Sequence, residues 1–118
     1  MSIRNYRDLI AWQRAMDLVE TVYHVTRAWP KEEMYGLTNQ VRRAATSIPA
    51  NIAEGQGRTG PKELLHHLSI ANGSLCEVET FALISRRLGY IDEQACQQLI
   101  TQTTEVARLI GGLMKSLQ

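Results

Sequence analysis

The sequence predicts an all-α protein, an up-down-up-down antiparallel four-helix bundle. Apolar residues recur at spacings of three and four along four long segments. The breaks between these segments are short and contain Gly or Pro, and no segment alternates apolar and polar residues as a strand does. At 118 residues, the chain is expected to form a single domain over residues 1–118.

The first helix is predicted over residues 8–28, with Asp8 as its N-cap and Trp29 ending it before Pro30. It carries two neighbouring apolar stripes, Leu9, Trp12, Met16, Val19, Tyr23 and Ala11, Ala15, Leu18, Val22, Val25, Trp29. A single bundle buries one such stripe readily, so the second predicts that the chain forms an oligomer.

The second helix is predicted over residues 33–54, and three glycines follow it. Gly55, Gly57 and Gly60 have the spacing of a dinucleotide-binding loop, which requires a strand before the glycines and a helix after them. Here a helix enters the glycines. We therefore interpret them as a helix end and a turn, with Gly55 as a C′ residue of positive φ.

The third and fourth helices are predicted over residues 61–88 and 92–117. Pro61 suits the first position of a helix, Gly89 suits the residue after a helix end, and Asp92 suits an N-cap. In an antiparallel pair, Cys76 and Cys96 would lie about 12 Å apart along the axis, too far for a disulfide. We expect both thiols to be reduced core residues.

The composition limits the classes of function that the chain can have. Thirteen Lys and Arg against twelve Asp and Glu give a net charge near +1, so no global field favours nucleic acid or anionic lipid. No apolar run is long enough to span a membrane and the N-terminus does not resemble a signal peptide, so we expect a cytoplasmic protein with no membrane partner.

Catalytic and metal sites are not indicated. Glu63 and His66 have the Glu-x-x-His spacing of ferritin-like proteins, but such sites need matching ligands on other helices, and the last helix has no His. The serines within the helices lack a positioned histidine base. We expect no metal, no cofactor and no enzyme activity.

Polar residues line one side of the second helix and have two interpretations. The first is a structural network with the third helix, in which Arg43 pairs with Glu77 or Glu79 and Asn51 caps the chain end near Gly55. The second is a nucleic-acid site that binds phosphates. The structural set is Gln40, Ser47, Asn51, Glu54 and Gly55, and the phosphate-binding set is Arg42, Arg43, Arg58 and Lys62.

Four stretches together give the chain a recognisable pattern, Tyr6–Gln13, Tyr35–Ala45, Ser47–Gly55 and Ile70–Glu77. Through them the chain resembles the bacterial four-helix-bundle family of 23S rRNA intervening-sequence proteins. The resemblance covers nearly the whole chain, and the stretch from Asn51 to Gly55 is its most specific part.

The resemblance implies a homopentameric, ring-like assembly of bundles. It also implies kinship with the accessory variability determinant proteins of diversity-generating retroelements, which partner a reverse transcriptase and bind nucleic acid. Three functions follow in decreasing order of expectation: a non-enzymatic oligomeric scaffold or accessory protein, an RNA- or DNA-binding ring, and a bundle enzyme. The ribosomal name reflects where some of the genes lie, so it does not imply a ribosomal protein.

Overall fold

The computed structural model describes residues 5–118, and this part of the chain is all-α, with no strand. The prediction of an all-α protein with four long helices is confirmed. Residues 1–4, which the predicted domain includes, lie outside the described part. The elements are η1 (Tyr6–Asp8), α1 (Ile10–Thr26), η2 (Lys31–Glu33), α2 (Leu37–Gly57), α3 (Pro61–Arg87) and α4 (Glu93–Ser116), where η marks a short 3-10 helix.

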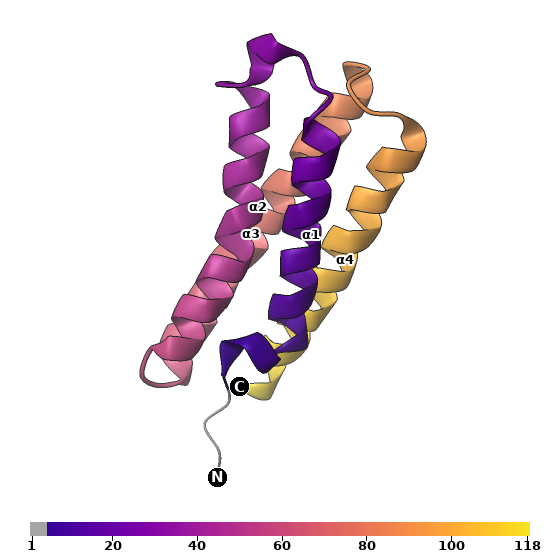
Figure 1. Cartoon of the computed structure of the whole chain (residues 1–118). Coiled ribbons are helices and arrows are strands. Elements are labelled where there is room, and N and C mark those ends of the chain that lie inside the picture. Colours follow the sequence, from indigo (N-terminus) through magenta and orange to yellow (C-terminus); the bar gives the residue numbers. More distant parts are fainter. Residues whose placement is uncertain (1–4) are drawn as a thin grey trace.

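The four helices form one elongated bundle. Each helix packs against the next in sequence, and α1 closes the arrangement by packing against α4. The α1–α2 and α3–α4 connections lie at one end and the α2–α3 turn lies at the other, so successive helices run in opposite directions (Figure 1). The described chain measures 49 × 24 × 19 Å.

The core takes one stripe from each helix. Leu18 of α1, Ile48 and Ile52 of α2, Leu68 of α3 and Ile110 of α4 are all fully buried. On α1 the buried stripe is the one that contains Leu18, together with Ala11, Ala15 and Val22. In the other stripe, Met16 is 38% exposed and Tyr23 is 39% exposed. The bundle therefore leaves part of this second stripe in contact with solvent.

Three predicted helix ends are confirmed. The Asp92 side chain caps α4 by accepting a hydrogen bond from the Ala95 N–H at 2.8 Å. Pro61 occupies the first turn of α3. Gly89 has a φ of +79° and follows the last residues of α3, where the Tyr90 N–H donates back to the Ser85 carbonyl at 2.9 Å. A glycine adopts this left-handed conformation without steric cost.

The boundaries around the α1–α2 connection differ from the prediction. Asp8 does not cap α1, which begins at Ile10 after an uncapped Leu9. The helix ends at Thr26 because the chain then turns so that buried Trp29 packs against the Tyr90 ring, with the centroids 5.8 Å apart. The α2 helix begins four residues later than predicted, since residues 31–33 form η2 instead.

Glu33 fixes the start of α2 and joins the two connections at this end of the bundle. Its carboxylate accepts a hydrogen bond from the Leu37 N–H at 3.1 Å and another from the Tyr90 hydroxyl at 2.8 Å. Both hydrogen bonds lower the pKa of Glu33, and the one from Tyr90 has the larger effect. The α1–α2 connection is thereby held to the turn before α4.

The prediction for Gly55 is wrong in its cause. The α2 helix continues to Gly57, and Gly60 and Gly89 are the only described residues with positive φ. Gly55 is instead a buried helical residue at which α2 and α3 approach closely. A Cβ added there would lie 2.7 Å from the His67 Cβ and 3.1 Å from the Leu64 Cδ1. The position requires glycine because α3 occupies the space of a side chain.

We expect Gly55→Ala to destabilise the protein by about 1–3 kcal/mol, because the added methyl group forces α2 and α3 apart. Gly111→Ala is the matched control, since Gly111 is a helical residue of α4 with nothing within 4 Å of an added Cβ. The control should gain about 0.5–1 kcal/mol from helix propensity. Urea unfolding measures both changes, and equal stabilisation of the two variants would contradict the close approach.

Candidate functional site

The polar side of α2 forms a hydrogen-bonded chain with α3. The Ser47 and Ser74 hydroxyls lie 2.8 Å apart. The Asn51 amide nitrogen donates to the Ser47 carbonyl at 2.9 Å and to the Ser47 hydroxyl at 3.1 Å. Its amide oxygen lies 3.0 Å from Nδ1 of His67, which must then carry the hydrogen and donate it. Of the two interpretations, this geometry favours a structural network for Ser47 and Asn51.

Several predicted details of the network are wrong. Asn51 does not cap the end of α2, because its amide is used on Ser47 and His67. Glu79 faces α4 and accepts a hydrogen bond from the Thr103 hydroxyl at 3.3 Å, so it is not a partner for Arg43. Arg43 makes no ion pair with Glu77 among residues 5–118.

His67 and Ser74 are the network members that sequence reasoning missed. His67 is only 8% exposed, so its ring lies between the two helices rather than in solvent. The two residues are seven apart on α3, so they share one side of the helix. Ser47 and Asn51, four residues apart, likewise share one side of α2. Two polar residues on one side of each helix are the sequence signal that could have identified His67 and Ser74.

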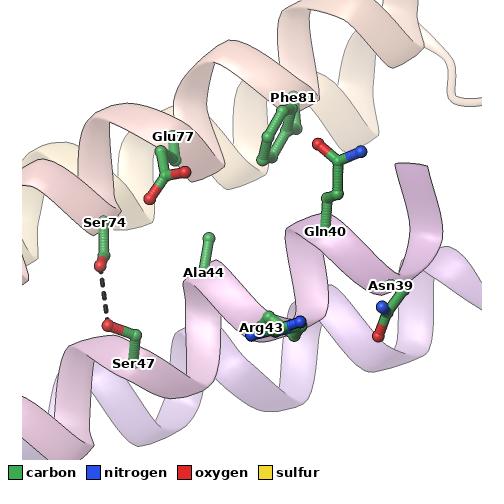
Figure 2. Close-up of a pocket in the computed structure, with 8 residues that line it drawn as sticks. All are labelled: Asn39, Gln40, Arg43, Ala44, Ser47, Ser74, Glu77 and Phe81. Carbon is green, nitrogen blue, oxygen red and sulfur yellow. Dashed lines mark hydrogen bonds between the residues drawn. The ribbon is translucent and has the colours of Figure 1, made fainter. Parts of the chain in front are cut away.

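A groove lies beside this network between α2 and α3, with a volume of about 350 Å³. Figure 2 shows Glu77 and Phe81 projecting from α3 toward α2, and Gln40 projecting from α2 toward α3. Ala44 has a small side chain that leaves this space open. We call this the α2–α3 groove, and its lining is Asn39, Gln40, Arg43, Ala44, Ser47, Ser74, Glu77 and Phe81.

The structure does not bring the four predicted phosphate-binding residues together. Half-buried Arg42 faces α1, where its Nε donates to the Thr26 hydroxyl at 2.9 Å and its guanidinium lies 4.6 Å from the Tyr23 ring centroid. Arg43 lines the α2–α3 groove. Arg58 lies beyond the end of α2, about 22 Å along the axis from Arg43 at 1.5 Å per residue. Lys62 is exposed in the first turn of α3.

Arg58 already has an anionic partner. Its guanidinium contacts the Glu54 carboxylate at 2.7 Å, and the side chains are about half exposed, 53% and 50%. This hydrogen bond lowers the pKa of Glu54 and raises the pKa of Arg58. An exposed pair of this kind adds little stability, but it reduces the charge that Arg58 offers to a phosphate.

Exposed apolar side chains gather on two neighbouring faces of the bundle. One lies along a groove between α1 and α2, the α1–α2 groove, formed by Tyr6, Trp12, Met16, Val19, Thr46, Pro49, Ala50 and Ala53. The other lies on α3 beside the α2–α3 groove. There Ile70, Glu77 and Ile84 recur every seven residues, and Leu88 follows one turn later, so the four form one strip, the α3 strip.

The outer side of α4 has a different character. Among the described residues, the large apolar side chains that are exposed belong to η1, α1, the α1–α2 connection and α3, and none belongs to α4. Its exposed residues are polar, small or charged, including Gln94, Gln97, Thr101, Thr104 and Arg108. The bundle thus has an apolar groove between α1 and α2, an apolar strip on α3 and a polar side along α4.

Metal and thiol chemistry have little support from the geometry. No three His, Cys, Asp or Glu residues between 5 and 118 are placed to hold a metal ion, Glu63 and His66 included. Both cysteines are free thiols. Cys76 is exposed, which corrects the expectation of a core position, while burial raises the pKa of Cys96. No helix in the described part of the chain is long and apolar enough to cross a membrane.

Residues 7–112 match the family model described as 23S rRNA-intervening sequence protein. The chain belongs to this family. No curated protein matches the chain. The fold of this intervening-sequence family member is similar to the crystal structure of a protein of unknown function from the S23 ribosomal protein family of Bacteroides thetaiotaomicron, with a TM-score of 0.83. That match covers 90% of this chain and 99% of the other at 20% sequence identity, so it supports the four-helix fold alone.

We expect Asn51→Ala to destabilise this family member by about 1–3 kcal/mol, because it leaves the buried His67 Nδ1–H without its acceptor. Asn39→Ala is the matched control on the same helix, since Asn39 is exposed and should change the free energy of unfolding by no more than about 0.5 kcal/mol. Urea unfolding of both variants compares the two costs. Equal effects would show that the network contributes no stability.

Proposed function

We propose that this protein is a non-enzymatic, cytoplasmic scaffold or accessory protein that acts as a ring-like homo-oligomer. The observation that supports this best is the pair of apolar faces, the α1–α2 groove and the α3 strip. Contiguous exposed apolar surface on a small domain is typical of protein–protein interfaces. The family resemblance adds the number of copies, five.

The placement of the two faces favours a ring. They are distinct surfaces, so a contact between one face and the other face of the next copy is heterologous and repeats from copy to copy. The helices pack in the cyclic order α1, α2, α3, α4, so α1 and α3 both pack against α2 and the two faces are neighbours around it. Contacts at neighbouring faces turn each copy relative to the last, which favours a closed ring over a straight filament.

Binding of nucleic acid, with a reverse transcriptase as partner, is the alternative and has less support. It needs one continuous basic band, but Arg42 is used on α1, Arg43 lies beside Glu77, and Arg58 is paired with Glu54. Arg42 and Lys62 make no ion pair among residues 5–118, but Arg42 is half-buried against α1, so only Lys62 of the four is both exposed and without an acidic neighbour across a groove. A polyanion would therefore meet a carboxylate at two of the four positions, Glu77 in the groove of Arg43 and Glu54 at Arg58.

Size-exclusion chromatography with light scattering tests the oligomer. We expect a mass of about five times 13.3 kDa for the wild type. Met16→Glu and Ile84→Glu should each lower this mass, because each places a charge within one of the two apolar faces. Gln97→Glu on the polar side of α4 is the control and should leave the mass unchanged. A wild-type monomer at micromolar concentration would contradict the proposal.

Titration with single-stranded RNA separates the scaffold from the alternative. We expect the wild type and the Arg58→Glu, Lys62→Glu double variant to bind equally weakly at about 50 mM and about 200 mM salt. Phosphate-driven binding would instead fall steeply with salt and with the loss of these charges. Binding at low salt that the double variant abolishes would favour the nucleic-acid ring.

A further inference from the structure

We propose that Arg43 and Glu77 set the register between copies of this chain, Arg43 by pairing with Glu20 of the neighbouring copy and Glu77 by pairing with Arg27 of that copy. The inference rests on the proposed homo-oligomer and identifies the charged side chains that position one copy on the next. It is argued from two opposite charges that line one groove and make no ion pair among residues 5–118.

Arg43 and Glu77 are exposed, line the same groove, and make no ion pair or side-chain hydrogen bond among residues 5–118. Some surface charges of the bundle do have partners, as Arg86 has Glu93 at 2.8 Å and Arg58 has Glu54. Others, such as Arg87 and Arg108, make no ion pair among residues 5–118, so it is the place of Arg43 and Glu77 on one groove that sets them apart. The groove thus presents a positive and a negative charge that remain available to another molecule.

Apolar side chains of α3 flank Glu77. Ile70 and Ile84 lie one heptad before and after Glu77, and Ile84 and Leu88 are 38% and 54% exposed. A few charges within an apolar surface are typical of a protein interface, where the apolar area supplies affinity and the charges supply orientation. A nucleic acid would place phosphates against Glu77, so this face fits a protein partner better.

The α1 side of the bundle presents a matching set. Met16, Glu20, Tyr23 and Arg27 recur at spacings of four, three and four, so they share one edge of α1, the α1 edge. Met16 lies in the α1–α2 groove, whereas Glu20 and Arg27 also line a groove toward Gln98 of α4. Glu20 and Arg27 are exposed and, like Arg43 and Glu77, make no ion pair within residues 5–118. The α1 edge therefore alternates apolar contacts with a negative and a positive charge.

The heights of these residues along the bundle agree with a closed ring. Rotation about a ring axis parallel to the helices brings together residues at the same height. Starting from the Ser47–Ser74 contact, Arg43 lies about 6 Å and Glu77 about 4.5 Å toward the same end, so the two are nearly level. On α1, the residues at about the same height are Tyr23 and Thr26, because both contact Arg42, the neighbour of Arg43 in sequence.

Glu20 and Arg27 lie on either side of this level. Glu20 is about 4.5 Å before Tyr23, and Arg27 directly follows Thr26. Long side chains span such offsets of about one helical turn. Arg43 and Glu77 differ in height by only about 1.5 Å, so each lies within about one helical turn of both Glu20 and Arg27. The sign of the charge, and not the height, selects the pairs Arg43 with Glu20 and Glu77 with Arg27. The opposite assignment would place like charges together, which disfavours other registers.

Charge reversal and its rescue test the pairing. We expect Glu20→Arg and Arg43→Glu each to raise the concentration at which the oligomer half dissociates at least tenfold, while the double variant in one chain returns to within about threefold of wild type. For a ring of five, whose dissociation constant scales with the fourth power of concentration, a tenfold change corresponds to about 1.1 kcal/mol at each interface, which is consistent with an interfacial charge pair. Arg27→Glu and Glu77→Arg form the second set, and Arg108→Glu on α4 is the control.

Dissociation is followed by light scattering over a dilution series, and circular dichroism checks that each variant is folded. Single reversals that leave the dissociation concentration unchanged in a wild-type oligomer would overturn the pairing while the proposed scaffold stands. Single reversals that weaken assembly without rescue by the double variants would also overturn it. A monomeric wild type would overturn the pairing and the scaffold together.

Discussion

The close packing of α2 against α3 is the constraint on which the rest of the structure depends. Gly55 lets the two helices approach each other, because a Cβ at this position would lie only 2.7 Å from the His67 Cβ. At that separation Asn51 reaches His67 and Ser47 reaches Ser74, so the polar groups between the helices are satisfied. The same contacts fix the relative heights of α2 and α3, and hence hold Arg43 and Glu77 level across one groove.

Sequence reasoning succeeded where the cause is local. Apolar spacing placed four helices, and Pro61, Gly89 and Asp92 marked ends that depend on backbone geometry within a few residues. It failed where the cause lies on another helix: Gly55 looked like a helix end and is a contact with α3. Arg43 was expected to pair with Glu77 or Glu79, yet Glu79 faces α4, which no spacing within α3 could distinguish. The polar set on α2 was correctly singled out, but its partners His67 and Ser74 were not.

The distribution of surface character links this fold to assembly. Among the described residues, the exposed large apolar side chains lie on or next to η1, α1 and α3 and in the α1–α2 connection, whereas α4 presents glutamines, threonines and charges to solvent. A net charge of +1 gives the chain little long-range attraction for any partner. Recognition would then depend on local contacts, with apolar area providing affinity and a few unpaired charges providing specificity. The charges on α1, α2 and α3 that make no ion pair among residues 5–118 have the signs that such a contact between copies requires.

The structure of the assembled oligomer, determined by crystallography or electron cryo-microscopy, tests the central claim most directly. The account predicts a closed ring in which the α2–α3 groove and the α3 strip of each copy pack against the α1 edge of the next, with α4 outermost and solvated. In that ring, Arg43 and Glu77 would each lie within about 4 Å of an opposite charge on the neighbouring copy, the distance of an ion pair. A ring in which α4 forms the interface, or one in which Arg43 and Glu77 face solvent, would contradict it.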